Sequence, residues 1–238
     1  MPAPVEKSGK FITWGVREML VREQLLGTSQ PVLAICLEPG ESVVGPTAEF
    51  AWMTDSIQLT DGQPGMSTYT AKTDAGTIAF AASQPGQIVP VDITPGTAYL
   101  VHDRAFLAGT PGIEVSTAES ALTGGPLPAG PTLSLRRISG NGRAWVALPG
   151  NTVRHDLAAG ASLRANPWHI GMTDVSVTVQ LAELPASPTN RADAKAHRVA
   201  VLSGPGSVWL LSLALPYTWA GPVPSPRFPP PREGGTTR

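Results

Sequence analysis

The sequence predicts an all-β fold in which three similar β-units of one chain form a pseudo-threefold barrel- or prism-like domain. Three observations support this. The 238 residues include 25 Gly and 25 Pro and only 15% charged residues, a composition that favours short strands and many turns over long helices. Turn sequences recur along the chain at similar spacing. Between them, apolar residues alternate as they do in half-buried strands.

The first recurring turn reads EPGES, TPGTA and AAGAS, and its three copies are centred on Gly40, Gly96 and Gly160. Apolar residues follow each glycine at the same three distances, of ten, seventeen and nineteen residues: Phe50, Phe106 and Ile170; Ile57, Ile113 and Val177; Leu59, Val115 and Val179. The alternative is that Pro-Gly turns recur by chance in a chain rich in both residues. The recurring turn, the three apolar positions and a second turn at constant spacing, given below, are five coincidences, which favour a triplicated unit.

A second turn lies forty-six residues after each of these glycines. It reads SQPGQI, SGNGRAWV and SGPGSVWL, and it contains Gly86, Gly142 and Gly206. The first copy lacks the first glycine and the tryptophan of the other two. In the first turn, Pro followed by Gly suits the centre of a type II turn. Gly142 and Gly206 are expected to reverse the chain before an apolar strand.

Two segments illustrate the predicted strands. Val175 to Leu184 places valines and Leu181 on one face and polar residues on the other, as in a half-buried strand. Ser207 to Leu215 is apolar at both parities, which suggests a strand covered on both faces. The second turn and the strand after it therefore close each unit.

The predicted organisation is one domain with two flanking segments. Residues 1–29 form a partly ordered N-terminal segment, in which Trp14 to Leu26 suits a helix and an edge strand equally well. Residues 30–215 form the triplicated domain, with units at about 37–93, 94–157 and 158–215. Residues 216–238 form a proline-rich tail that is expected to be extended and disordered.

Charge and cysteine content restrict the setting of the protein. Lys and Arg number 17 against 18 Asp and Glu, so no overall field attracts nucleic acid or an anionic membrane. Peripheral membrane association has no support in the sequence. The N-terminus carries no secretory signal pattern, and a cytoplasmic location is expected. Cys36, the single cysteine, lies in an apolar run and is predicted to be a buried, inert thiol.

The repeats carry a resemblance to a known family. The phrases LEPGESVVGPTAEFAWMTDSIQL, ITPGTAYLVHDRAFLAGTPGIEV and LSGPGSVWLLSL resemble the altered-inheritance-of-mitochondria (mitochondrial biogenesis) family, formerly a domain of unknown function and widespread in bacteria. The similarity covers roughly residues 30–215. It implies three units like the tryptophan RNA-binding attenuation protein, arranged with internal pseudo-threefold symmetry. It implies no activity, although a yeast mitochondrial relative linked to inner-membrane organisation suggests a scaffolding role.

The chain departs from this family in its late loops. Members often carry a glycine-rich loop there. The second unit has LTGGPLPAGPTL, Leu122 to Leu133, but the third has the polar SPTNRADAKAHR, Ser187 to Arg198. A function placed in these loops is therefore in doubt for this chain.

The sequence contains no motif of nucleophilic, phosphate-binding or metal chemistry. His102 and His155 are each followed by Asp, and a His and the next residue on a strand point to opposite faces, while His169 and His197 stand alone. Asp55 and Asp174 fall near the same repeat position and are read as turn residues. We therefore expect no catalytic, cofactor-binding or metal-binding residues, and no enzyme.

The aromatic residues give the remaining candidates. Trp145 and Trp209 occupy buried strand positions and are read as core residues rather than as platforms for nucleic-acid bases. Trp52 and Trp168 are the candidates for a surface interaction. Pro226 and Pro229 in the tail fit a polyproline II ligand, although a solvated tail without function is the favoured interpretation.

The predicted function is a non-enzymatic scaffold or protein-interaction domain with protein partners and the capacity for self-association. The alternative is a small-ligand or nucleic-acid binding module that uses a face of the pseudo-trimer. A ring of matched polar residues would favour the alternative, but the matched positions are apolar.

Overall fold

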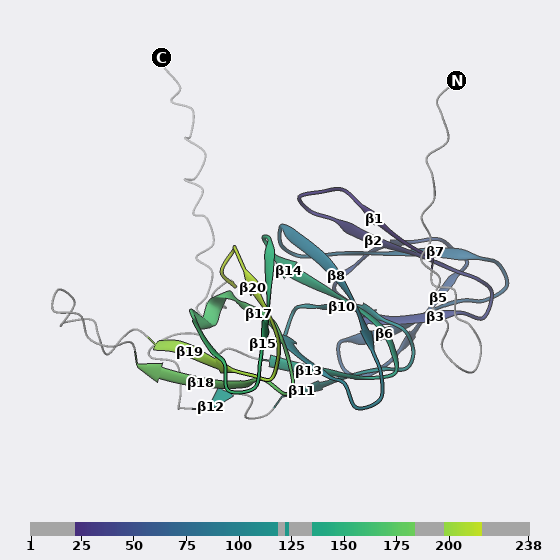
Figure 1. Ribbon diagram of the computed structural model, residues 1–238. Coiled ribbons are helices and arrows are strands. Elements are labelled where there is room, and N and C mark those ends of the chain that lie inside the picture. The colour runs from purple at the N-terminus through teal and green to yellow at the C-terminus, as the bar shows by residue number, and fades with distance from the viewer. Residues whose placement is uncertain (1–21, 119–121, 124–134, 184–197, 216–238) are drawn as a thin grey trace, which may run out of the picture.

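The structure, a computed structural model, describes residues 22–118, 122–123, 135–183 and 198–215 (Figure 1). The regular elements in this part of the chain are β-strands and one short 3-10 helix, η1 (Pro167–His169). The predicted all-β class is confirmed. Figure 1 shows the purple N-terminal strands at one end of the molecule and the green to yellow C-terminal strands at the other.

The strands fall into three sets of six, in chain order. The first set is β2 (Val32–Leu37), β3 (Ser42–Pro46), β4 (Phe50–Met53), β5 (Ile57–Asp61), β6 (Met66–Ala71) and β7 (Gly76–Ala81). The second set is β8 (Gly86–Ile93), β9 (Tyr99–His102), β10 (Phe106–Gly109), β11 (Ile113–Thr117), β13 (Leu135–Gly140) and β14 (Gly142–Pro149). The third set is β15 (Thr152–Leu157), β16 (Ser162–Ala165), β17 (Ile170–Asp174), β18 (Thr178–Glu183), β19 (Arg198–Ser203) and β20 (Gly206–Leu211).

The same four antiparallel pairings occur within every set. In the first set, β7 lies between β2 and β4, and β6 lies between β3 and β5. In the second set, β14 lies between β8 and β10, and β13 between β9 and β11. In the third set, β20 lies between β15 and β17, and β19 between β16 and β18. The units were predicted to begin at the first recurring turn. Each set of strands begins one strand earlier, with β2, β8 and β15.

One irregularity also recurs at the same place. The register of the third strand against the sixth shifts by one residue, which is the signature of a β-bulge. The shift lies between Phe50 and Trp52 in β4, between Phe106 and Ala108 in β10, and between Ile170 and Met172 in β17. The bulge follows the apolar residue that stands ten positions after each turn glycine.

Neighbouring sets join by sharing sheets. One six-stranded sheet has the order β5-β6-β3-β10-β14-β8, with three strands from the first set and three from the second. A second has the order β11-β13-β9-β17-β20-β15, with three strands from the second set and three from the third. The junctions are the pairings of β3 with β10 and of β9 with β17.

Among the described residues the third junction that would complete a ring is missing, so the predicted barrel is not closed. The two remaining sheets have four strands each, in the orders β1-β2-β7-β4 and β12-β18-β19-β16. Their end strands β4 and β16 occupy the positions of the strands that pair at the other two junctions. Within the described residues, however, β4 and β16 do not pair with each other.

Two short strands stand outside the three sets. β1 (Arg22–Leu26) pairs along its full length with the outer edge of β2, and β12 (Leu122–Thr123) adds to β18 in parallel. The end of the predicted N-terminal segment is thus an edge strand and not a helix. The proline-rich tail and most of the two late loops lie outside the described residues.

The core consists of three apolar clusters, each beneath one set. Leu33, Ile35, Tyr69 and Phe80 lead the first cluster, which Trp145 of the second set joins. The second cluster includes Ile93, Phe106 and Val146, and the third includes Val179, Leu202 and Val208. All these side chains are at least 94% buried, so each set contributes a substantial share of the hydrophobic stabilisation.

The first recurring turn has one geometry in its three copies. Gly40, Gly96 and Gly160 have φ of 86°, 92° and 79°, in the left-handed region that glycine adopts without strain. The residue after each glycine donates its N–H to the carbonyl three residues earlier, at 2.9 to 3.0 Å. Gly142 and Gly206 in the second turn also have positive φ, of 149° and 141°.

Candidate functional site

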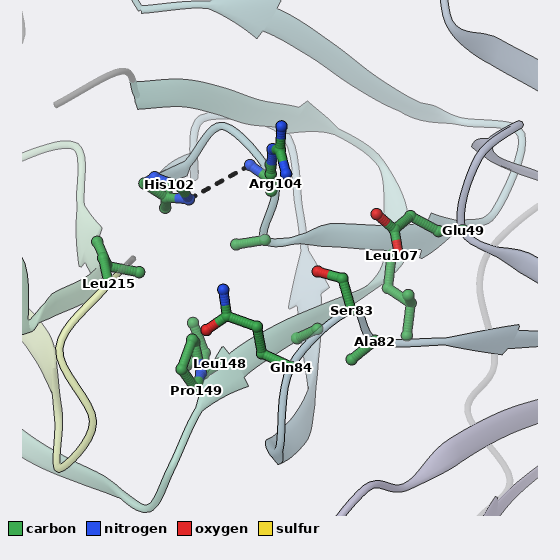
Figure 2. A pocket seen from close by; sticks show the side chains of 12 residues that line it. Glu49, Ala82, Ser83, Gln84, His102, Arg104, Leu107, Leu148, Pro149 and Leu215 are labelled. Atoms are coloured by element: carbon green, nitrogen blue, oxygen red, sulfur yellow. Dashed lines mark hydrogen bonds between the residues drawn. The ribbon is translucent and has the colours of Figure 1, made fainter. Parts of the chain in front are cut away.

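A small hollow lies where the first and second sets meet. Figure 2 shows His102 and Arg104 on one side of it and Gln84, Leu148 and Pro149 on another, with Glu49 nearby. Its volume is about 30 Å³, which accommodates about two water molecules. Pockets that bind small organic ligands are typically ten or more times larger.

His102 is the buried polar group of this hollow. The residue is 6% exposed, and Arg104 donates its backbone N–H to Nδ1 at 3.4 Å (Figure 2). Nδ1 also lies 3.1 Å from Oδ1 of Asp103. This contact arises because β9 ends at His102, so Asp103 lies in a turn and does not point to the opposite face. Burial lowers the pKa of His102 below 6.5, and the charge of Arg104 adds to this effect while that of Asp103 opposes it.

Glu49 adds a second titratable group to the hollow. Burial raises its pKa above 4.5, while the positive charge of Arg104 acts in the opposite direction. The hollow therefore contains an imidazole whose pKa is lowered, beside a carboxyl group whose pKa is raised and a guanidinium.

The other histidines named in the sequence do not line this hollow. His155 is exposed on β15. His169 ends η1, and its Nδ1 lies 2.7 Å from the carbonyl oxygen of Leu211. His197 lies outside the described residues. In the part of the chain that the structure describes, no three His, Cys, Asp or Glu side chains form a group that could hold a metal ion.

Asp174 has a structural role that Thr residues perform in the other two sets. Its Oδ2 accepts the backbone N–H of Ser207 at 2.6 Å. At the matching positions, Oγ1 of Thr110 accepts the N–H of Arg143, and Oγ1 of Thr54 accepts the N–H of Thr77, both at 3.1 Å. The residue that matches Asp174 is therefore Thr54 and not Asp55, which follows it.

Cys36 is exposed, so the prediction of a buried thiol was wrong. Its neighbours Ile35 and Leu37 are buried, but Cys36 points to the opposite face of the sheet, where its side chain is exposed. Its Sγ lies 3.5 Å from Oγ1 of Thr77, directly across on β7.

A partly buried ion network ties β1 to the second set. Arg143 donates to Asp92 through Nε at 2.8 Å and through Nη2 at 3.2 Å, and to Glu23 through Nη1 at 3.2 Å. Glu23 also accepts the indole N–H of Trp145. Trp145 is 1% exposed and belongs to the core, as predicted. The sequence offered no signal for this network, because Glu23 is about 120 residues away from its partners.

Trp209 is half-buried and lies on the surface of the third set. Arg154 stacks over its ring at 5.1 Å from the centroid, and Tyr99 meets it edge-on at 5.9 Å. Asp156 accepts hydrogen bonds from Ser207 at 2.7 Å and from Arg154 at 2.9 Å, and both lower its pKa. The guanidinium groups of Arg143 and Arg154 thus each donate to a carboxylate.

Exposed apolar side chains gather on strands at the edges of sheets. Trp52 on β4 is 47% exposed, Val153 on β15 is 55% exposed, and Leu25 and Leu26 on β1 are 48% and 38% exposed. Each of these strands ends its sheet. Trp168, the other predicted surface aromatic, is half-buried in η1 and packs against the second core cluster. Trp52 is therefore the more accessible of the two candidates.

Trp52 differs from the residues at its matching positions. Ala108 on β10 and Met172 on β17 follow the same bulge, and both are fully buried. Met172 lies opposite Val101 on β9. Trp52 is exposed because β4 ends its sheet, with no further strand on that side in the described part of the chain.

No helix among the described residues is long and apolar enough to cross a membrane.

Comparison with known proteins identifies the fold and the family. A crystal structure of a protein from Streptococcus pyogenes superimposes with a TM-score of 0.64 at 18% sequence identity, over 82% of this chain and 94% of that chain. At this identity the likeness shows the fold alone. A search of curated proteins finds no match. The model of the family described as mitochondrial biogenesis AIM24 matches residues 24–213, and the chain belongs to that family.

Proposed function

We propose that this protein is a non-enzymatic scaffold that binds protein partners through the open edges of its sheets, in the cytoplasm. In this proposal its body consists of three repeats related by pseudo-threefold symmetry. The observation that carries the proposal is the placement of exposed apolar side chains on the edge strands β1, β4 and β15. Soluble proteins usually protect sheet edges with charge, proline or a covering element, and open edges serve as binding sites for an added strand.

Other features support protein partners over the alternatives. The hollow beside His102 is small for an organic ligand. Arg143 and Arg154, which flank the two tryptophans of the closing strands, are engaged by carboxylates, whereas binding of single-stranded nucleic acid depends on free cations around exposed aromatics. Both observations make a small-ligand or nucleic-acid module the weaker candidate.

Site-specific photocrosslinking in the protein's own cells tests the proposal. A photoreactive phenylalanine analogue replaces Trp52, Val153 or Leu25, and as a control it replaces Lys72, which is exposed in a turn. We expect one defined protein to crosslink at an edge position and not at Lys72. The dissociation constant of that partner, measured with purified proteins, should rise by about tenfold or more when Lys replaces the edge residue.

A different result would contradict the scaffold proposal. If a small molecule or metal ion purifies with the protein in stoichiometric amount, and if its removal lowers the thermal unfolding midpoint, the protein is a ligand-binding module. Turnover of that molecule would further contradict the absence of enzymatic activity.

A further inference from the structure

We propose that the open edge of β4 pairs with β16 of a second copy of this chain, so that copies join head to tail. This inference rests on the proposed function, because it names one partner of the edges described above. It follows from the organisation of the sheets. Each six-stranded sheet of this molecule contains three strands from one set and three from the next. The sheets that end in β4 and β16 each contain three strands from one set, so together they could form a third sheet of this kind.

The two junctions inside the chain set the rule for such a pairing. In the first, Gly109 lies opposite Val44. In the second, Thr173 lies opposite Leu100. Gly109 and Thr173 both stand thirteen residues after their turn glycines, and Val44 and Leu100 both stand four residues after theirs. One register therefore holds at both junctions.

The same rule predicts the register between copies. Met53 stands thirteen residues after Gly40, and Arg164 stands four residues after Gly160, so these two residues should lie opposite each other. Trp52 should then lie opposite Ala165, as Met172 lies opposite Val101 inside the chain. A large side chain would face a small one, which suits close packing across the junction.

The exposure of side chains on β4 and β16, compared with residues at matching positions inside the chain, supports a missing strand at both edges. Ala108 and Met172 are fully buried at the internal junctions, whereas Trp52 at the matching position is 47% exposed. On the other edge, Val101 is fully buried, whereas Ala165 at its matching position is half-buried. A second copy would therefore cover Trp52 and Ala165. The residues at the matching positions are already buried at the two junctions inside the chain.

The geometry also determines the type of assembly. The edge β4 and the edge β16 are different surfaces, so the contact is heterologous. An open assembly therefore keeps one free edge at each of its two ends until a ring closes. The occupant is a second copy because the chain itself provides the complementary strand with the required register.

Disulfide trapping with the full-length chain tests both the pairing and the register. All variants carry Cys36→Ser, which removes the exposed native thiol. One preparation carries Met53→Cys and a second carries Arg164→Cys, and the two are mixed under mild oxidation. Directly opposite residues have Cα atoms about 4.5–5.5 Å apart, which a disulfide can bridge. We expect a crosslinked dimer, which must be intermolecular because each chain has one cysteine.

The matched control shifts the register by one residue. Met53→Cys is mixed with Leu163→Cys, whose side chain points to the other face of the strand, and no crosslink is expected. Crosslinks of equal yield in both mixtures would overturn the proposed register and the proposal with it. If the double variant Met53→Cys, Arg164→Cys forms its disulfide only within single chains, the third junction closes inside the molecule and a second copy is excluded.

Native mass spectrometry on the uncrosslinked protein gives an independent readout. We expect the mass of an assembly of two or more chains. Met53→Arg places like charges opposite each other at the junction and should raise the dissociation constant roughly five- to tenfold, and the added substitution Arg164→Glu should restore assembly. Gln63→Arg, in the exposed loop between β5 and β6, is the control that leaves the mass of the assembly unchanged.

A monomer at micromolar concentration would overturn self-association. It would leave the scaffold proposal standing if the photocrosslinking experiment still captured a different protein at Trp52. The two proposals can therefore fail separately.

Discussion

At the scale of single residues, His102 shows how a buried polar group is kept in one charge state. The ring is 6% exposed, and burial lowers its pKa below 6.5 because the charged form loses its hydration. The unfolded chain binds a proton near pH 6.5, whereas the folded chain binds it only at lower pH. Stability from this group is therefore fully present above pH 6.5 and is lost as pH falls through the pKa of the folded state.

We predict that the free energy of unfolding decreases between pH 7 and pH 5 and that His102→Gln removes part of this decrease. One proton accounts for a slope of at most about 1.4 kcal/mol per pH unit. The raised pKa of Glu49 acts with the opposite sign, so the comparison with the variant isolates His102. Chemical denaturation at several pH values measures the effect, and His155→Gln, at an exposed position, is the control. Parallel pH curves for wild type and His102→Gln would contradict the prediction.

Single residues also show where sequence patterns are silent. Cys36 and Trp52 are apolar or weakly polar residues in strands, and alternation alone cannot show which face of a strand another element covers. Cys36 is exposed because it lies on the face of its strand opposite the buried Ile35 and Leu37. Trp52 is exposed because its edge lacks a neighbour. Both outcomes depend on contacts between segments that are distant in the chain.

At the scale of elements, the two recurring turns use glycine for different reasons. Gly96 has φ of 92°, and a Cβ added to it would meet nothing within 4 Å. Gly142 has φ of 149°, and an added Cβ would lie 2.0 Å from Oγ1 of Thr110. That oxygen accepts the backbone N–H of Arg143, so the clash would break the contact that holds the turn to β10.

We predict that Gly142→Ala lowers the free energy of unfolding by about 2–4 kcal/mol, whereas Gly96→Ala lowers it by about 1–2 kcal/mol. The smaller loss reflects backbone strain alone, and the larger loss adds the clash and the broken hydrogen bond. Urea denaturation of the two variants checks the order. Equal losses would mean that the space around Gly142 adjusts without cost.

The presence of a strand was predicted from the sequence more accurately than the residues at which it begins and ends. The alternating segment from Val175 predicted a strand, and Val179 and Leu181 are indeed buried on one face. The strand begins only at Thr178, because the N–H of Val177 bonds to the carbonyl of Asp174 and closes a turn there. Val175 is 38% exposed as a result. A turn of this kind has no signal in an alternating apolar pattern.

At the scale of the whole molecule, the sequence predicts the class of the fold and the positions of its turns, but not how the sets of strands close. Repeated apolar positions indicate what each set buries. They do not indicate the angle between one set and the next, which decides whether three sets meet or leave two edges open. For the same reason the sequence pointed to Trp52 as a surface residue but not to β16 as the strand that matches its edge.

Pairing of the open edges would also change thermal stability, which can be measured without disulfide trapping. If copies pair through β4 and β16 in the folded state only, association stabilises the folded chain by mass action, and the thermal unfolding midpoint rises with protein concentration. We predict such a rise over a hundredfold range of concentration, and a flat response for Met53→Arg, whose junction is weakened. Differential scanning calorimetry measures both, with Gln63→Arg, in an exposed loop, expected to follow the wild type. A midpoint independent of concentration in the wild type would mean that the edges of β4 and β16 stay unpaired in the folded protein, and that the exposed Trp52 serves a different protein.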